Sequence, residues 1–251
     1  MRIGIGAGAD IGKVLVAAKG ASSGIEVSVY AAGEHAGDAR DPAIVISGHP
    51  GEDLVGDLVD GRIDAAVRGS LPANTTLRAL REATGVDHLL RIALLSTRKG
   101  QRFLLAPVGV DEGWTVEEKV ELIERGRGYL ALFGLPGEVA VLSGGRHGDL
   151  GRHPVVDRGI AQAELVARLT GAVHREILIE DAIRSAGLII APDGISGNLI
   201  FRTLVHLGEG HAHGAPVVNI DRIFVDTSRA SPDYADALIT ASELAKTVKI
   251  P

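Results

Sequence analysis

Two arginines border a predicted strand-to-helix junction in the first third of the chain, where they could bind an anion. The residue pattern predicts a strand over residues 63–67, an exit from that strand near Gly69, and a helix that starts near Asn74. Ligands of open α/β sheets bind beyond the carboxyl ends of the strands, and a guanidinium group suits bidentate contacts with phosphate or carboxylate. Arg68 and Arg78 are therefore candidates for binding an anionic substrate. The alternative interpretation is a solvated arginine on a helix face at each position.

Two glycine-rich segments, residues 4–10 and 143–149, each follow a predicted strand and could hold an anion with backbone amides. In the first segment, Ile11 stands where a dinucleotide-binding loop would have its third glycine. We therefore expect a tight turn there, with an anion site at the helix start as the alternative. The second segment contains Arg146 and lacks the Gly-Lys-Ser/Thr ending of a nucleoside-triphosphate loop. A phosphate cradle and a mobile surface loop are both compatible with it.

The segment 192–198, Pro-Asp-Gly-Ile-Ser-Gly-Asn, follows another predicted strand. At the end of that strand Asp193 would face a binding site, although the turn preference of Asp-Gly also explains this residue. Ser196 is the predicted N-cap of the following helix, because its hydroxyl can accept a hydrogen bond from a helix amide that has no partner within the helix.

The segment 226–233, Asp-Thr-Ser-Arg-Ala-Ser-Pro-Asp, separates a predicted strand from the last predicted helix. Pro232 fits the first helical position, and Ser231 fits the N-cap before it. Asp233 would then stabilise the positive end of the helix dipole. This capping role is the simplest interpretation of Asp233.

Three histidines, His206, His211 and His213, fall within eight residues, and imidazoles are common metal ligands. Two of them lie in a glycine-rich loop, which provides no rigid frame for a coordination sphere. The chain has no cysteine, which removes thiolate metal sites, cysteine nucleophiles and disulfides. We therefore predict no metal in this protein.

Composition and charge exclude several classes of function for the 251-residue chain. The formal net charge of −6 and the lack of a block of basic residues argue against binding to nucleic acid. The chain has no run of 18 apolar residues, and residues 1–6 read as a first strand rather than a secretion signal. We therefore expect a cytoplasmic protein without a membrane span. Few thermolabile side chains fit a thermophilic source, with a GC-rich genome as the alternative explanation of the composition.

Short β patterns alternate with helical patterns through most of the chain, which predicts a mostly parallel sheet covered by helices. Two strands over residues 88–96 and 103–108, joined by a polar turn, predict an antiparallel hairpin. Thr115 and Glu118 form the pattern of a capping box before a helix. A further short strand is predicted over residues 176–179.

The predicted hairpin interrupts the alternation of strands and helices and indicates that the chain enters a second lobe there. We predict a first α/β lobe from residues 1–90 and 216–251 and a second α/β lobe from residues 91–215. A cleft between two such lobes would bring distant segments of the chain together.

Three of the segments described above occur in the order and spacing of the phosphate acetyl- and butyryltransferase superfamily, the phosphotransacetylase-like proteins. From about residue 63 to its end the chain resembles this superfamily, and within it the chain is similar to the MtxX proteins of methanogens, also called methanogenesis marker protein four. The resemblance implies the isocitrate/isopropylmalate dehydrogenase-like fold, with two three-layer lobes and a cleft, and a homodimer. The matching residues are Gly69, Thr75, Thr76, Leu77, Arg78, Ala79 and Leu80, then Pro192, Asp193, Gly197 and Asn198, and then Asp226, Ser228 and Arg229.

The resemblance also implies catalytic roles. In these acyltransferases an Asp takes the proton of the coenzyme A thiol, and the thiolate attacks an acyl phosphate while Arg and Ser stabilise the developing charge. Ser228 and Arg229 match the Ser and the Arg, and Asp233 would be the base, with Asp236 or Asp226 as alternatives. The motifs and the resemblance together give these candidate ligand-binding residues: Arg78, Thr75, Gly69, Asp193, Asn198, Asp226 and Arg146.

Three hypotheses for the function follow. The first is a transferase that binds an acyl phosphate, phosphate or coenzyme A-like ligand in the cleft and is linked to methanogenesis. The second is a methyltransferase of methanogenesis, although the sequence has no S-adenosylmethionine signature. The third is a non-catalytic protein that uses the same cleft to bind and that associates with a methyltransferase partner. In the first case we expect a small anionic substrate, with coenzyme A or an acyl phosphate as the candidates.

Overall fold

The computed structural model describes residues 1–21, 24–33 and 44–247. The chain divides into two compact units, which we call unit 1 (Met1–Leu89 and His213–Pro251) and unit 2 (Leu90–Ala212). Each unit contains a six-stranded sheet with helices packed on it, so each is an α/β unit. The cleft between two lobes stays a prediction.

The sheet of unit 1 is mainly parallel and has the strand order β11-β12-β4-β1-β2-β3. Among the described strands of this sheet, only β11 and β12 pair antiparallel. The central strands β1 and β4 are almost completely buried, as expected of apolar runs between two layers of helices. The strands are β1 (Arg2–Ala7), β2 (Glu26–Ala31), β3 (Ile44–Ile46), β4 (Ala65–Val67), β11 (Ala215–Pro216) and β12 (Phe224–Asp226).

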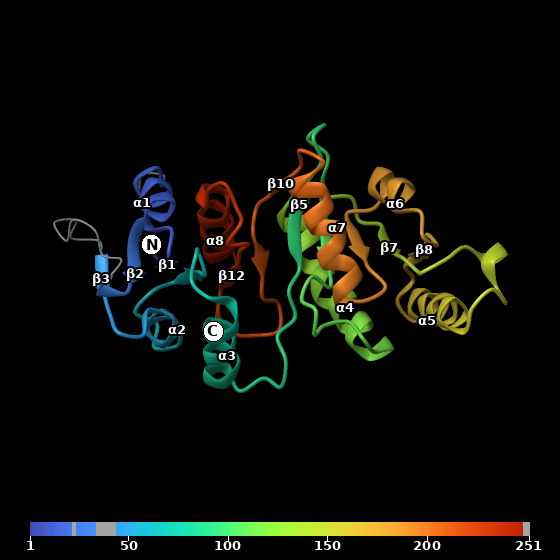
Figure 1. Cartoon of the computed structure of the whole chain (residues 1–251), viewed down its shortest axis with the longest axis horizontal. Helices are drawn as coiled ribbons and strands as arrows, with labels where there is room; N and C mark the ends of the chain where they lie inside the picture. Colours follow the sequence, from blue (N-terminus) through green and yellow to red (C-terminus); the bar gives the residue numbers. More distant parts are fainter. Residues whose placement is uncertain (22–23, 34–43, 248–251) are drawn as a thin grey trace. The chain divides into compact units, whose positions relative to one another are not determined.

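Two pairs of helices cover the sheet of unit 1 (Figure 1). Helices α1 and α8 contact each other on one face, and helices α2 and α3 contact each other on the opposite face. Leu54, Leu58 and Leu80 from the second pair are fully buried in the core, next to Tyr30 and Phe224 of the sheet. The four helices are α1 (Ile11–Lys19), α2 (Pro50–Val59), α3 (Ala73–Thr84) and α8 (Ala235–Thr247).

The sheet of unit 2 has the strand order β10-β5-β6-β9-β7-β8. β5 and β6 form an antiparallel pair, with Ala93 opposite Leu105 and Ser96 opposite Arg102, which confirms the predicted hairpin. β10 also pairs antiparallel with β5, whereas β6, β9, β7 and β8 are parallel. The strands are β5 (Ala93–Ser96), β6 (Arg102–Ala106), β7 (Val139–Val141), β8 (Val173–His174), β9 (Leu188–Ile190) and β10 (His211–Ala212).

The helices of unit 2 pack on this sheet and on one another. α4 contacts α5 and β9, and α7 contacts β6 and β10. A methyl group at Gly126 of α4 would lie 2.7 Å from a methyl carbon of Leu188, so the missing side chain lets this helix approach the sheet closely. None of the described helices is both long enough and apolar enough to cross a bilayer. The elements are α4 (Val116–Leu132), a short 3₁₀ helix η2 (His147–Asp149), α5 (Pro154–Thr170), α6 (Ile179–Ser185) and α7 (Gly194–His206).

The strand predicted over residues 176–179 is wrong. The strand in this region is β8, which ends at His174, and α6 already begins at Ile179. Glu176 has φ +55°, a left-handed backbone conformation that a continuing strand does not adopt. The β-branched isoleucines at 177 and 179 suggested a strand, but the turn at Glu176 separates them from the sheet.

Helix starts follow the predicted chemistry in one case and depart from it in another. Thr115 Oγ1 accepts a hydrogen bond from the Glu118 amide at 3.1 Å, and the Glu118 carboxylate accepts one from the amide of Trp114 at 2.9 Å. This is a capping box in which the return bond is shifted by one residue. The N-cap of α7 is Asp193, whose carboxylate accepts a hydrogen bond from the Ser196 amide at 2.8 Å, so the predicted cap at Ser196 is wrong.

The predicted start of the last helix is also wrong, because α8 begins at Ala235 rather than at Pro232. Ser231 does not cap it; its hydroxyl instead donates a hydrogen bond to the carbonyl of Asp233 at 2.7 Å. The Asp233 carboxylate accepts a hydrogen bond from the Ala235 amide at 3.1 Å. Asp233 therefore stabilises the start of the helix, which is the capping role that the sequence analysis gave it.

Candidate functional site

A pocket with a volume of about 440 Å³ lies in unit 1, next to the carboxyl ends of β1 and β4. These strands are parallel neighbours, so the segments that follow them meet at the same edge of the sheet. The first turns of α2 and α3 complete the walls, and one arginine reaches them from the segment after β12. The lining residues are Ala7, Gly8, Ala9, Ala32, Gly48, His49, Pro50, Gly51, Glu52, Ser70, Leu71, Pro72, Thr75, Thr76 and Arg229.

Glycines allow the two loops at this edge to pack against each other. Gly69 has φ +59°, and a Cβ atom there would lie 2.0 Å from the carbonyl oxygen of Gly6. The Gly8 amide donates a hydrogen bond to Ser70 Oγ at 2.9 Å, and the Ser70 amide donates one to the Gly6 carbonyl at 3.1 Å. The first glycine-rich segment is thus the tight turn that we expected. Gly69, a predicted ligand-binding residue, allows this close backbone approach and is not among the residues that line the pocket.

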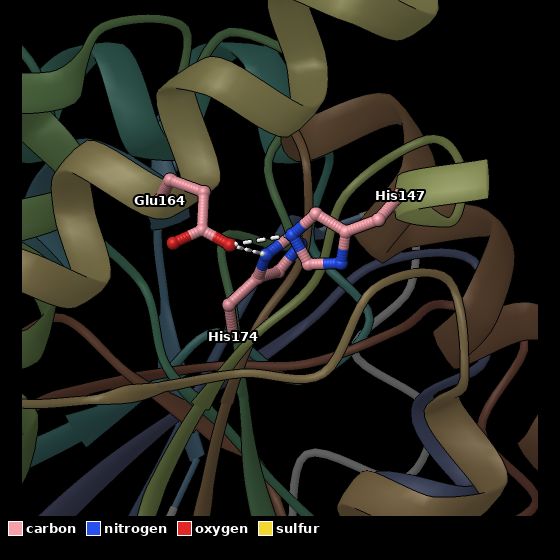
Figure 2. Close-up of side chains that lie close together, drawn as sticks. All are labelled: His147, Glu164 and His174. Atoms are coloured by element: carbon pink, nitrogen blue, oxygen red, sulfur yellow. Dashed lines mark hydrogen bonds and ion pairs between the residues drawn. The ribbon is translucent and has the colours of Figure 1, made fainter. Parts of the chain in front are cut away.

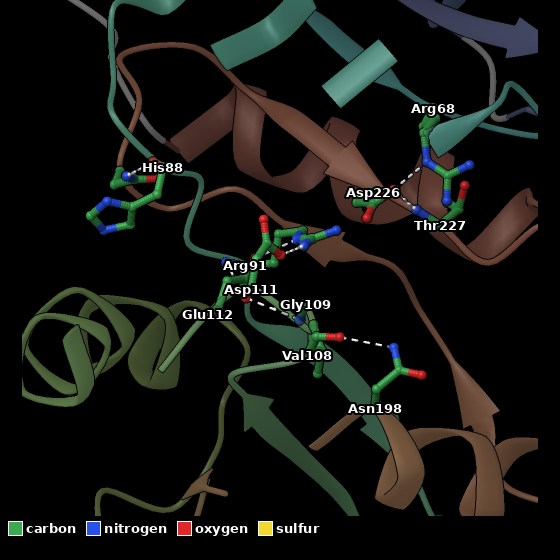
Figure 3. Close-up of polar contacts among 11 residues, drawn as sticks. Arg68, His88, Arg91, Val108, Gly109, Asp111, Glu112, Asn198, Asp226 and Thr227 are labelled. Carbon is green, nitrogen blue, oxygen red and sulfur yellow. Dashed lines mark hydrogen bonds and ion pairs between the residues drawn. The ribbon is translucent and has the colours of Figure 1, made fainter. Parts of the chain in front are cut away.

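A buried ion pair fixes the segment that carries Arg229. The side chains of Arg68 and Asp226 are 5% and 11% exposed, and Arg68 Nε donates a hydrogen bond to Asp226 Oδ1 (Figure 3). Arg68 also donates to the Leu71 carbonyl at 2.6 Å, and Thr227 Oγ1 donates to the Gly69 carbonyl at 2.7 Å. The pair therefore joins the loop after β4 to the loop after β12. Arg68 is buried in this network, so the predicted contact between its guanidinium and an anionic substrate is wrong.

The three predicted catalytic residues lie on the same short segment, and one of them reaches the pocket. Arg229 is exposed and lines the pocket, whereas Ser228 and Asp233 are not among the lining residues. Ser228 Oγ accepts a hydrogen bond from the Ala230 amide at 3.2 Å. Asp236, the alternative base, is paired with His213 at 2.9 Å. The catalytic roles of Ser228, Arg229 and Asp233 stay predictions.

Two threonines at the start of α3 line the pocket. Thr75 Oγ1 donates to the Pro72 carbonyl at 3.3 Å, which leaves its acceptor lone pairs available. Thr76 Oγ1 is buried and, in the described part of the chain, has no hydrogen-bond partner. Arg78 is exposed one turn further along the helix and does not line the pocket. The structure thus brings Thr75 and Arg229 together in one pocket and leaves Arg78 outside it.

The helix ends make the pocket attractive to an anion. Neither α2 nor α3 has a side-chain hydrogen bond at its N-cap, and both first turns line the pocket. The first amides of a helix lack partners within the helix, and the helix dipole adds positive potential at that end. Arg229 adds a full positive charge, which the carboxylate of Glu52 partly opposes. A small anion is the ligand that this arrangement suits best.

The segment 192–198 has a structural role in unit 2. Asn198 donates a hydrogen bond to the Val108 carbonyl at 2.9 Å (Figure 3). A Cβ atom at Gly194 would lie 1.6 Å from the Gly109 carbonyl oxygen, and one at Gly197 would lie 1.9 Å from the Pro107 carbonyl oxygen. These residues therefore hold the start of α7 against the loop at 107–112. Ligand binding by Asp193 and Asn198 stays a prediction.

The Asp193→Ala variant is expected to lower the free energy of unfolding by about 1 kcal/mol, because the Ser196 amide at the start of α7 loses its acceptor. Urea denaturation followed by circular dichroism measures this change. The matched control is Ser196→Ala, since this serine does not cap the helix, and its effect should be clearly smaller. Equal effects of the two variants would contradict the assignment of the cap.

The loop at 107–112 is held by a second buried ion pair. Glu112 is 1% exposed and accepts a hydrogen bond from Arg91 Nε at 2.5 Å and one from the Gly109 amide at 3.1 Å (Figure 3). Burial raises the pKa of Glu112, and the Arg91 guanidinium opposes this effect. The pair stabilises the surface on which α7 rests.

The glycine-rich segment 143–149 binds carboxylates of the protein itself. The Arg146 amide donates to Asp149 Oδ2 at 2.9 Å, and the His147 amide donates to Glu176 Oε1 at 2.8 Å. These two amides therefore already have anionic partners, which weakens the phosphate-cradle interpretation of the loop. Arg146 is exposed, and its role as a ligand-binding residue stays a prediction.

The structure groups a different set of histidines from the one noted in the sequence. His206 packs against the ring of Phe201, and His213 pairs with Asp236. Instead, His147, Glu164 and His174 of unit 2 place one ligand atom each within 4.8 Å of one another (Figure 2). The hydrogen bonds to Glu164 and Glu176 raise the pKa of His147. The sequence analysis missed this group, because its members are 10 and 17 residues apart and come from three different elements.

Proteins of methanogenic archaea are similar to this chain. “Putative methyltransferase mtx subunit X” of Methanosarcina acetivorans is 48% identical over 212 residues, which cover 82% of this chain and 73% of the relative. The protein of the same name from Methanosarcina barkeri is 45% identical over 206 residues, covering 80% and 76%. An “Uncharacterized methyltransferase” of Methanopyrus kandleri is 40% identical over 260 residues, covering 98% and 99%. A scan against models of known protein families found no match.

Solved structures confirm the predicted fold. A branched-chain phosphotransacylase from Enterococcus faecalis V583 superposes with a TM-score of 0.77 at 17% identity, covering 98% of this chain and 99% of that protein. A phosphotransacetylase from Streptococcus pyogenes gives a TM-score of 0.73 at 18% identity, covering 99% and 94%. Isocitrate dehydrogenase from Methylococcus capsulatus gives 0.53 at 13% identity, covering 98% and 83%. The fold is therefore phosphotransacetylase-like, within the isocitrate/isopropylmalate dehydrogenase-like class.

Proposed function

This chain belongs to the family of methanogen proteins called mtx subunit X, and we propose that it is a transferase that binds a small anionic ligand in the unit 1 pocket. The ligand class is an acyl phosphate, phosphate or the phosphate-bearing end of a coenzyme A-like molecule. The observation that carries the proposal is the presence of Thr75, Ser70 and Arg229 in one pocket at the carboxyl edge of a parallel sheet.

The pocket residues suit a phosphoryl group. Arg229 supplies a guanidinium, which binds two phosphoryl oxygens at once and is charged at every physiological pH. The start of α3 and the Gly51 amide of α2 supply donors that are fixed before the ligand arrives. Pro50 has no N–H, and the Glu52 amide donates to the His49 carbonyl at 3.0 Å. Thr75 and Thr76 supply hydroxyl groups at the same wall. Preorganised donors of this kind stabilise the charge that develops on oxygen when an acyl group is transferred from phosphate.

The acyl acceptor in this proposal is a thiol of the coenzyme A type. Its proton would go to the Asp233 carboxylate, the thiolate would attack the acyl carbon, and phosphate would leave with the electron pair of the carbon–oxygen bond. Ser228 and Arg229 would stabilise the negative charge during the attack. We include a link to methanogenesis in the proposal, because the named relatives come from methanogens. We also include a homodimer, which is what the resemblance to the phosphotransacetylase-like superfamily implies.

The Arg229→Ala variant is expected to bind acetyl phosphate or inorganic phosphate about 10- to 100-fold more weakly, because a hydrogen-bonded charge contributes about 1.5–3 kcal/mol. Isothermal titration calorimetry with the full chain measures this change. Arg81→Ala is the matched control, since Arg81 is an exposed arginine of α3 that does not line the pocket. Arg78→Ala tests the remaining predicted arginine and should behave like the control.

Two results would overturn the proposal. The first is a lack of phosphate and acetyl phosphate binding by the wild-type chain. The second is wild-type binding by Arg229→Ala. Binding without formation of acyl coenzyme A from acetyl phosphate and coenzyme A would keep the ligand class and remove the transferase step.

The names of the relatives favour a second candidate function, a methyltransferase or a non-catalytic subunit that assists one. Calorimetry with S-adenosylmethionine and with a methylated pterin tests the first form. Affinity purification of the tagged chain from a methanogen tests the second form, for which the expected result is a methyltransferase that copurifies. If neither ligand binds and no methyltransferase copurifies, this candidate function is removed.

A further inference from the structure

Two histidines and a glutamate from three separate elements of unit 2 point their side chains at the same place (Figure 2). His147 comes from η2, Glu164 from α5 and His174 from β8. Glu164 Oε1 lies 2.8 Å from His147 Nε2 and 2.7 Å from His174 Nδ1. The two imidazole rings are in edge contact, with their centroids 5.3 Å apart. Two ring nitrogens and one carboxylate oxygen thus converge on a small volume.

The other nitrogen of each ring is held from outside this volume. His147 Nδ1 lies 2.8 Å from Glu176 Oε1, and His174 Nε2 lies 2.8 Å from Ser143 Oγ. Protein metal sites have this second layer, in which a carboxylate or other acceptor fixes the orientation of each ligating imidazole and the nitrogen that carries its proton. Both rings are therefore oriented as metal-binding histidines are.

The outer contacts also provide acceptors for the protons of the two rings. Ser143 donates its only hydroxyl proton to the Gly145 carbonyl at 2.9 Å, so it accepts the proton of His174 Nε2. The Glu176 carboxylate can accept the Nδ1 proton of His147 in the same way. When the rings are neutral and carry their protons on these outer nitrogens, His147 Nε2 and His174 Nδ1 offer lone pairs to a cation. Bonds to the cation then replace the hydrogen bonds of these two nitrogens to Glu164.

The surroundings suit an ion that can be reached from solvent. The His174 side chain is 5% exposed, which gives the site one rigid ligand. The side chains of His147 and Glu164 are 55% and 52% exposed, so their side of the group faces solvent. Metal–ligand bonds of about 2.0–2.2 Å place the ligand atoms of a tetrahedral site roughly 3.3–3.6 Å apart. A small rotation of the exposed Glu164 side chain would open the present distances to this range.

We propose that His147 Nε2, Glu164 and His174 Nδ1 bind one divalent cation of the zinc class, with a further coordination position open to solvent. Two imidazoles and one carboxylate are a donor set that zinc takes in sites that retain an exchangeable ligand. The proposal concerns residues of unit 2 and is independent of the anion pocket in unit 1. It differs from the sequence-based expectation of a protein without metal, which rested on the three histidines at 206–213.

The test is zinc binding by the full chain after treatment with a chelator. We expect one equivalent of Zn²⁺ in equilibrium dialysis, and a visible spectrum of tetrahedral type when Co²⁺ replaces it. The His147→Ala and Glu164→Gln variants should each lower the affinity at least about 100-fold, and Glu176→Gln should lower it about 10-fold through the second layer. His147 and Glu164 are exposed, so these variants are expected to fold, which circular dichroism verifies.

The matched control is His211→Ala, which removes an exposed histidine of the same unit outside the group and should leave the affinity unchanged. A wild-type chain that takes up neither Zn²⁺ nor Co²⁺ would overturn the proposal. Wild-type affinity in the folded His147→Ala variant would also overturn it, as would a loss of binding in His211→Ala equal to that in His147→Ala.

Discussion

The Asp226→Ala variant is expected to lose about 3–5 kcal/mol of unfolding free energy. Asp226 is the partner of Arg68, and both side chains are almost fully removed from solvent. Without the carboxylate, the Arg68 guanidinium keeps its charge inside unit 1 with only the Leu71 carbonyl as a described acceptor. Arginine does not release its proton at any accessible pH, so the cost of the unpaired charge cannot be avoided by neutralisation.

Chemical denaturation of the wild type and the variant measures this loss. Asp221→Ala is the control, because Asp221 is an exposed aspartate in the same stretch of chain, and its effect should stay within about 0.5 kcal/mol. The double variant Arg68→Met with Asp226→Leu removes both charges and should recover most of the stability. A loss below about 1 kcal/mol in Asp226→Ala would contradict the buried pair.

The Asp226 result also bears on the anion pocket. Thr227 donates its amide proton to the Asp226 carboxylate and its hydroxyl proton to the Gly69 carbonyl. Asp226 therefore fixes the backbone directly before Ser228 and Arg229. The double variant is therefore expected to be stable and yet to bind phosphate more weakly than the wild type. In this view Asp226 is a positioning residue for Arg229.

The Gly194→Ala variant is expected to destabilise unit 2 by about 3 kcal/mol or more. Its Cβ atom would lie 1.6 Å from the Gly109 carbonyl oxygen and 2.9 Å from that of Glu112, and neither is the end of a flexible side chain. To accept the methyl group, α7 must move away from the loop at 107–112. That movement would also break the hydrogen bond from Asn198 to the Val108 carbonyl.

Gly128→Ala is the matched control for this experiment. Gly128 lies inside α4, and a Cβ atom there would meet nothing within 4 Å. The same chemical change is therefore expected to stabilise the protein by roughly 0.5–1 kcal/mol, because alanine is the better helix former. Thermal and urea denaturation of the two variants should thus shift in opposite directions. A stable Gly194→Ala variant would show that α7 does not contact the loop as described.

The residues in the matched motifs divide into two groups according to their environment. Gly69, Gly194, Gly197 and Asn198 hold backbone segments together. Thr75 and Arg229 are available to a ligand, because both line the pocket. The sequence alone does not separate these groups, because close packing and ligand binding both limit which amino acid can occupy a position.

The sequence by itself determined the local features of this protein. The alternation of strands and helices, the hairpin of β5 and β6 and the cap at Thr115 all follow from the side-chain pattern and from contacts with near neighbours in the chain. The tight turn before α1 was predictable for the same reason. The errors at residues 176–179 and at the start of α8 arose where a turn overrode the local propensity.

Only the tertiary structure decided which distant side chains meet. Arg68 and Asp226 are 158 residues apart in the sequence and become partners because β4 and β12 are parallel neighbours. His147, Glu164 and His174 meet because β7 and β8 pair and α5 lies beside them. The physical reason is that side-chain pattern specifies the period and the buried face of each element, whereas the pairing of strands brings residues from distant parts of the chain to one point.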